Sequence, residues 1–191
     1  MALSPDLTVR ETALLAGVSA KTVEKALEAG VLKAVPAPAR FRGGAARFLP
    51  IRAVAFFHAL DAADLADLPL RHRRALWDQL TTLKPGPLQA IEFAPGAALD
   101  LERLAAPALR YAERYRDARD RHIAPAPDGG APVVAGTGLT VHAVLARLEG
   151  GATLEDLAAE YPAVLPRAFA AAQVYATTHP LRGRPKGRGG G

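Results

Sequence analysis

The residues of this sequence best suited to chemistry are basic side chains, and they gather near the two ends of the chain. The formal net charge is +5, from 24 Lys and Arg against 19 Asp and Glu. Residues 1–60 hold eight basic and four acidic residues, and residues 181–191 hold four basic residues and no acid. Cationic groups at defined places predict contact with a polyanion or an acidic protein surface, the alternative being an ordinary solvated face.

Side chains that carry catalysis or bind metals are scarce. The chain has no Cys, which excludes disulfides, thiolate metal sites and cysteine nucleophiles. Its five His are scattered without zinc-ligand spacing, and its two serines, Ser4 and Ser19, lie in no nucleophile elbow. We therefore expect no enzyme activity, no metal and no cofactor.

The elements that position the basic residues can be read from composition and periodicity. Half of the residues are hydrophobic, and 16 Pro and 17 Gly mark breaks between modules. We expect a mainly α fold with small β elements, and no apolar run of the ~20 residues that span a membrane. With no signal-peptide pattern at the start either, we expect a soluble, cytoplasmic protein. The expected modules are 1–60, 61–123, a linker at 124–130, 131–178 and a flexible tail at 179–191.

Residues 8–29 carry the signals of two short helices joined by a tight turn. Thr8 and Glu11 are spaced as a capping box, Gly17 lies in the turn, and Ser19 can cap a second helix over 20–29. This is the pattern of a helix-turn-helix, whose second helix places side chains in the DNA major groove. The candidate contacts on this helix are Ser19, Lys21, Thr22 and Lys25.

A segment rich in Arg, Phe and Gly follows. Arg40-Phe41-Arg42 and Arg47-Phe48 flank Gly43-Gly44, which predicts two strands around a Gly-Gly turn, a wing that contacts the DNA backbone through Arg40, Arg42 and Arg47. Together with Gly17-Val18-Ser19, Thr22-Val23 and Ala29-Gly30-Val31-Leu32, residues 7–60 resemble the MerR winged helix-turn-helix. The resemblance implies operator binding and transcription regulation. Glu24 lies where such regulators usually have Arg, and helix-turn-helix folds also serve as protein docking units.

The region 61–123 is expected to connect and to dimerise. We predict a helix over 70–83, a hairpin with strands at 88–93 and 98–101, and a helix over 100–122 whose regular part begins at Pro107. Apolar residues in this last helix alternate steps of three and four: Leu101, Leu104, Ala108, Tyr111, Tyr115 and Ala118. Such a stripe is typical of a core-facing helix or of a short dimer seam.

The third module, 131–178, carries the most specific motif. Gly130-Ala131-Pro132-Val133-Val134-Ala135-Gly136-Thr137-Gly138-Leu139-Thr140-Val141 precedes a helix, followed by a Thr153 and Asp156 cap and a last helix over 166–176. The segment resembles a small bacterial domain of unknown function found in VapB-type antitoxins, which pair with PIN-like toxins. It departs from that family at Gly138 and Thr140, where the family has Arg and Pro.

Two short strands, 133–134 and 139–141, are expected around the Gly136-Thr137-Gly138 turn. A short strand that lacks a partner would pair across a dimer. The alternative that these glycines bind phosphate is disfavoured, because no Gly-Lys-Ser/Thr follows.

The tail contains Arg182-Gly183-Arg184-Pro185-Lys186, the core of an AT-hook, followed by Arg188. These cations fit an A·T minor groove, or the acidic metal-binding site of a nuclease toxin, or a solubilising end. From the resemblance we assign toxin binding to Arg182, Arg184, Lys186 and Arg188.

The sequence therefore predicts the antitoxin of a type II toxin–antitoxin system. It is expected to be a nucleoid-associated homodimer that represses its own operator and neutralises a PIN-like ribonuclease toxin, with no membrane partner. The alternative is a free-standing MerR-like transcriptional regulator with a C-terminal sensor or partner-binding module.

Overall fold

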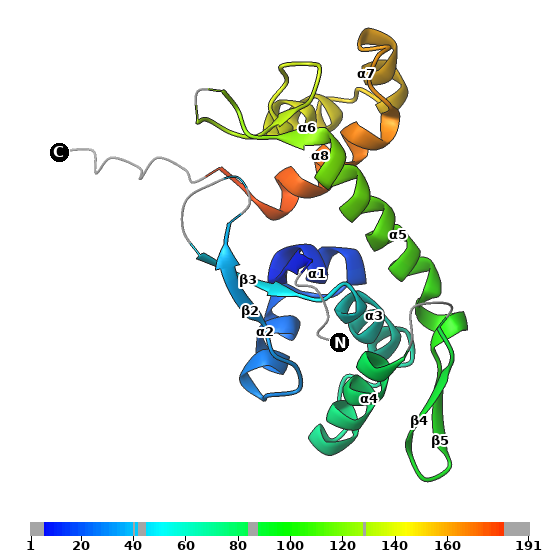
Figure 1. Cartoon of the computed structure of the whole chain (residues 1–191). Coiled ribbons are helices and arrows are strands. Elements are labelled where there is room, and N and C mark those ends of the chain that lie inside the picture. The colour runs from blue at the N-terminus through cyan, green and yellow to red at the C-terminus, as the bar shows by residue number, and fades with distance from the viewer. Residues whose placement is uncertain (1–5, 40, 42–44, 84–87, 128, 182–191) are drawn as a thin grey trace, which may run out of the picture. The chain divides into compact units, whose positions relative to one another are not determined.

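A computed structural model describes residues 6–39, 41, 45–83, 88–127 and 129–181 of the chain (Figure 1). The fold is mainly α with small antiparallel sheets, as predicted. The chain forms two compact units, Met1–Asp120 and Arg121–Gly191. Their boundary falls near the end of the long helix α5 (Leu101–His122), ahead of the expected linker at 124–130.

The first unit begins with the predicted helix-turn-helix, α1 (Val9–Ala16) and α2 (Ala20–Glu28). The Glu11 amide donates to Thr8 Oγ1 at 3.3 Å and the Thr8 amide donates to Glu11 Oε2 at 2.7 Å, so the capping box forms. Gly17 ends α1 with φ +76°, a left-handed conformation that glycine adopts without a steric penalty. Ser19 Oγ then accepts the Thr22 amide at 3.1 Å and starts α2.

The wing is a three-stranded antiparallel sheet with the order β1 (Leu7–Thr8), β3 (Ala45–Leu49), β2 (Val35–Pro38). Arg40 and Arg42 lie outside the described residues, and the strand paired with β3 lies upstream of the expected one, with Val35 opposite Phe48 and Pro38 opposite Ala45. Pro36 and Pro38 are tolerated there because β2 is an edge strand, where a missing N–H breaks no ladder.

Two further helices complete the core of this unit, α3 (Arg52–Ala62) and α4 (Leu70–Thr82). Phe56 and Trp77 are both buried, with ring centroids 5.5 Å apart in an edge-to-face arrangement, so Trp77 is a core residue. The predicted hairpin forms from β4 (Ala90–Ala94) and β5 (Ala97–Asp100), and α4 packs against β4.

Helix α5 has the predicted bounds to within one residue, but its regular part begins before Pro107. Pro107 lies inside it and costs one backbone hydrogen bond, but the turn before it is retained because Leu101, Ala105 and Ala106 are buried. The buried face also includes Ala112, Tyr115, Ala118 and Arg119. Of the predicted stripe, Leu101, Tyr115 and Ala118 lie in the core, whereas Tyr111 is 46% exposed.

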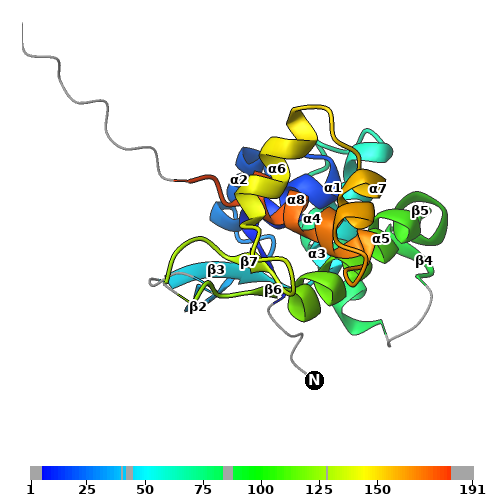
Figure 2. The same ribbon diagram turned by 90° about the horizontal axis from the view of Figure 1, so that it is seen from above.

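The second unit contains β6 (Ile123–Ala124), β7 (Val133–Val134), α6 (Val141–Glu149), α7 (Leu154–Glu160) and α8 (Pro166–Thr178). Helices α6 and α8 pack side by side in both views (Figures 1 and 2). The Thr153 and Asp156 capping box starts α7 as predicted. Phe169 and Leu157 are fully buried in the core of the unit.

The expectation that a short strand of this unit lacks a partner in its own chain, and so would pair across a dimer, is wrong. β7 is not without a partner, because it pairs with β6 of the same chain, and Val133 also forms a bridge with Thr140. Pairing with β6 also takes Ala124 out of the expected linker. In the part of the chain that the structure describes, no helix is long and apolar enough to cross a bilayer.

Candidate nucleic-acid interface

The outward face of α2 carries charged side chains of both signs. Val23 and Ala26 are buried and turn the opposite face of the helix to the core. The exposed side chains include two predicted DNA contacts, Lys21 and Lys25, and two acids, Glu24 and Glu28. These four charges cancel, so α2 alone does not present a basic surface.

Ser19 and Thr22, the other two predicted contacts on this helix, are used locally. Their hydroxyl oxygens lie 2.9 Å apart, and Ser19 Oγ also accepts the Thr22 amide. Both residues are exposed, but the Ser19 hydroxyl caps the helix and the Thr22 hydroxyl is hydrogen-bonded to it. Their first role is to fix the start of α2.

The wing and α2 meet through an ion pair. Arg47 Nη2 of β3 lies 3.8 Å from Glu24 Oε1, and the two side chains are 54% and 48% exposed. An exposed pair of this kind contributes about 0–1 kcal/mol, so Arg47 can exchange the carboxylate for a phosphate at little cost. The sequence marked Glu24 as unusual but gave no sign that its partner is Arg47.

The remaining predicted contacts are not placed. Arg40 and Arg42 of the wing lie outside the described residues, and so do the tail residues Arg182, Arg184, Lys186 and Arg188. The structure thus brings together Lys21, Lys25 and Arg47 around Glu24, on adjoining elements of one unit.

An arginine of α4 holds the C-terminal end of α2. Arg74 Nη2 donates to the Ala29 carbonyl at 2.7 Å, and Arg74 Nε donates to the Gly30 carbonyl at 3.1 Å. A cation at the carboxyl end of a helix satisfies free carbonyl groups and favours the helix dipole. No local sequence signal marks this residue, because 44 positions separate Arg74 from Gly30.

A buried ionic cluster ties α1 to α5. Arg119 Nη1 lies 3.0 Å from Glu11 Oε1, with Arg119 and Glu11 0% and 1% exposed. Tyr115 donates its hydroxyl proton to the same Glu11 oxygen, and Arg119 Nη2 donates to the Asp6 carbonyl at 3.1 Å. Glu11 thus caps α1 with one oxygen and binds α5 with the other.

The environment of this cluster shifts two pKa values. Burial, followed by the negative charge of Glu11, raises the pKa of Tyr115 well above its usual 10.0. Burial, the largest single influence, would lower the pKa of Arg119, but Glu11, Tyr115 and Asp120 together more than offset it and raise that pKa. Arg119 therefore stays cationic and Tyr115 stays a neutral hydrogen-bond donor.

In the second unit, the Gly136-Thr137-Gly138 turn is closed by its own side chain. Thr137 Oγ1 donates to the Val134 carbonyl at 2.9 Å and accepts the Leu139 amide at 2.9 Å. Thr140, which replaces the Pro of the family pattern, caps α6 by accepting the Ala143 amide at 3.1 Å. These contacts give the turn a structural role.

The acidic and imidazole side chains do not converge. Within the described ranges, no three His, Asp or Glu residues lie together as metal ligands. His142 Nε2 instead lies 2.8 Å from the His179 carbonyl, and joins the start of α6 to the residue after α8.

The family match found by comparison with known proteins lies in the second unit. The family described as "Protein of unknown function (DUF433)" matches residues 122–176, which lie in the second unit. No curated protein matches the chain. Among solved structures, the X-ray crystal structure of Rv2018 from Mycobacterium tuberculosis is similar at 20% identity, covering 90% of this chain and 99% of that chain with a TM-score of 0.35. The similarity of this chain to a protein family is to DUF433 and is confined to residues 122–176.

Proposed function

We propose that this protein is the antitoxin of a type II toxin–antitoxin pair. It occupies its own operator as a repressor through the first unit and neutralises a PIN-like ribonuclease by protein–protein binding, with no reaction catalysed. The observation that carries the proposal is the helix-turn-helix of α1 and α2, whose solvent-exposed second helix adjoins the β2–β3 wing.

The DNA contacts follow from the geometry of a winged helix-turn-helix. The N-terminal turn of α2 enters the major groove, where Lys21 and Lys25 contact phosphate or guanine. Arg47 leaves Glu24 for the adjacent phosphate. Because α2 has no net charge on its exposed face, the basic surplus of residues 1–60 supplies most of the attraction. A homodimer would place two such helices on the two halves of a palindromic operator.

Toxin binding is assigned to the C-terminal part of the chain. The support is the VapB-type pattern of residues 130–178 and the four basic residues of the tail. Guanidinium groups pair bidentately with carboxylates, the side chains that hold the metal of a PIN-like nuclease. Inhibition is then steric and electrostatic.

Co-expression with the product of the adjacent gene tests the proposal. We expect growth rescue, a complex of defined size, and binding of the purified protein to the DNA upstream of its own gene that weakens steeply with salt. A protein that leaves its neighbour's toxicity intact and ignores duplex DNA at low ionic strength overturns it. Operator binding without any inhibition favours a free-standing MerR-like regulator instead.

Deletion of residues 182–191, which leaves the contact between His142 and the His179 carbonyl in place, separates the functions of the tail. If the tail binds toxin, the truncated protein keeps its operator affinity and loses inhibition. If inhibition persists while DNA affinity drops, the tail acts as an AT-hook in the minor groove.

A further inference from the structure

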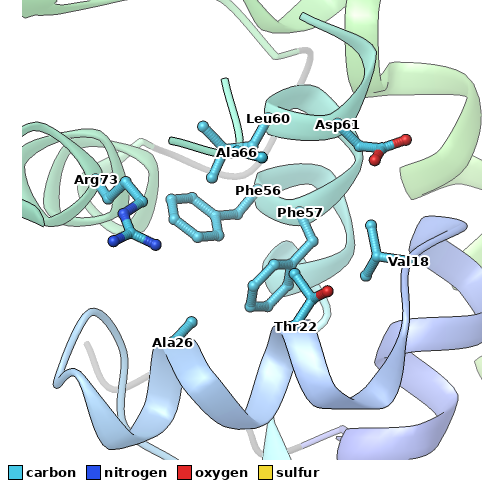
Figure 3. Close-up of a pocket in the computed structure, with 9 residues that line it drawn as sticks. All are labelled: Val18, Thr22, Ala26, Phe56, Phe57, Leu60, Asp61, Ala66 and Arg73. Atoms are coloured by element: carbon cyan, nitrogen blue, oxygen red, sulfur yellow. The ribbon is translucent and has the colours of Figure 1, made fainter. Parts of the chain in front are cut away.

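A small pocket lies between the α2 helix, the turn before it, α3 and α4. Its volume is about 70 Å³, and its walls are mainly apolar, formed by Val18, Ala26, Phe56, Phe57 and Leu60. Figure 3 shows the Phe57 ring of α3 over α2 and the Phe56 ring pointing toward Arg73 of α4. All of these residues belong to the first unit.

Arg73 is the polar group in this pocket that points to a ligand. Its Nε is buried and has no hydrogen-bond partner. A buried N–H group of a cation without an acceptor carries a desolvation penalty, which a carboxylate on the accessible part of the same guanidinium group would offset electrostatically. The rest of the side chain is only half-buried, so an anion can reach it from solvent.

The chemistry of the walls defines the ligand class. A guanidinium group pairs best with a carboxylate, and the phenylalanine rings offer apolar surface to a hydrocarbon chain. Asp61 lines the pocket on the side away from Arg73 in Figure 3, so a carboxylate at Arg73 does not meet it first. One water molecule occupies about 10–15 Å³ of a cavity volume measured in this way, so the pocket has room for about five non-hydrogen atoms. We propose that it binds a short-chain carboxylate of about two to four carbons, with the carboxylate on Arg73 and the chain against Phe56 and Phe57.

Such a ligand would contact the helix that we assign to DNA. Thr22 and Ala26 of α2 line the pocket, and the same Thr22 completes the cap of that helix. The proposed ligand binding does not depend on the proposed DNA binding, because Arg73 and the apolar wall of the pocket are present without nucleic acid.

The test is an NMR titration of the full chain with sodium propionate at constant ionic strength. We expect saturable amide shifts at Val18, Thr22, Ala26 and Phe57. Propionamide, which has the same shape without the charge, should bind more weakly by about tenfold or more, as the loss of a hydrogen bond between charged groups predicts.

Arg73→Gln should weaken propionate binding to a similar degree. Arg71→Gln is the matched control, since it removes the same charge from the exposed part of the same helix and should change the affinity less than about twofold. If Arg73→Gln does not fold, the comparison of propionate with propionamide on the unmodified protein still decides. The absence of saturable shifts at about 100 mM propionate, equal binding of propionamide, or equal affinity of a folded Arg73→Gln protein overturns the proposal.

Discussion

At the scale of single residues, the pair of Glu24 and Arg47 decides how the proposed DNA surface behaves. Glu24 repels phosphate and also holds Arg47, which lies 3.8 Å away. We expect Glu24→Gln to raise affinity for nonspecific duplex DNA, because it removes a negative charge and frees a guanidinium group. Since an exposed pair contributes about 0.2–1 kcal/mol, the gain should be at most about fivefold at low salt. A fluorescence anisotropy titration measures it.

Glu28→Gln provides the matched control. It removes the same charge from the same exposed face of α2, and Arg47 stays with Glu24. The gain should therefore be smaller than for Glu24→Gln. Equal gains in both variants would mean that only net charge matters and that the release of Arg47 contributes nothing.

The buried cluster of Glu11, Tyr115 and Arg119 is a second residue-scale feature. Removing one member leaves an uncompensated charge in the core, which costs about 3–5 kcal/mol. We therefore expect Arg119→Met to destabilise the first unit by about this amount in urea unfolding. Glu11→Gln combined with Arg119→Met should be less destabilised than the sum of the single variants, because the second change removes the orphaned charge.

Additive effects in this cycle would show that the two side chains do not interact. The single variant Arg116→Met serves as a control, because Arg116 is the half-buried neighbour on α5 and pairs with Asp6 at 3.8 Å, near the surface. It should cost about 1 kcal/mol or less.

At the scale of elements, local signals were predictable and register was not. The capping boxes of Thr8 and Thr153 and the turn at Gly17 involve residues within three or four positions, so the sequence predicts them correctly. The first wing strand was misplaced because its position is set by pairing with β3, and the charged and aromatic pattern around Arg40 gives no information on that register.

The contacts that position α1 and α2 could not be predicted for the same reason. Arg74 reaches the end of α2 across 44 residues, and Arg119 reaches Glu11 across 108. Neither arginine belongs to a motif, and nothing in the sequence around either residue distinguishes it from an arginine at the surface. The buried face of α5 also differs from the predicted apolar stripe, because Tyr111 belongs to the stripe and yet is 46% exposed.

Arg74 gives the element-scale prediction. Arg74→Ala removes both hydrogen bonds to the end of α2, and we expect faster amide hydrogen exchange over residues 26–32 and a stability loss of about 1 kcal/mol. Arg71→Ala, one turn earlier on the exposed part of α4, should leave the exchange of α2 unchanged. Unaltered exchange in Arg74→Ala would mean that the carbonyl contacts do not hold the helix.

At the scale of the whole molecule, the two units differ in what identifies them. The second unit coincides with the DUF433 match, and the sequence motif that suggested a separate domain lies inside it. The first unit is compact up to Asp120, so residues 61–120 share a core with the helix-turn-helix. Periodicity does not reveal this, because Leu76 and Trp77 could pack within their own module as well as against α3.

The two units should also differ in their response to acid, through His122. Its Nε2 is buried without a hydrogen-bond partner, and burial, then Arg167 and Arg121, lower its pKa below the usual 6.5. The folded second unit thus favours the neutral imidazole, so this contribution to stability is present above about pH 6.5 and is lost as the pH falls through the lowered pKa. The intrinsic rate of amide exchange falls between pH 7 and pH 5, so the measurement is the protection factor, which corrects for it. We expect the protection factors of residues 123–178 to fall over this range. His122→Gln should remove that fall, because glutamine does not titrate, and a variant that keeps the full acid response would assign it to other groups.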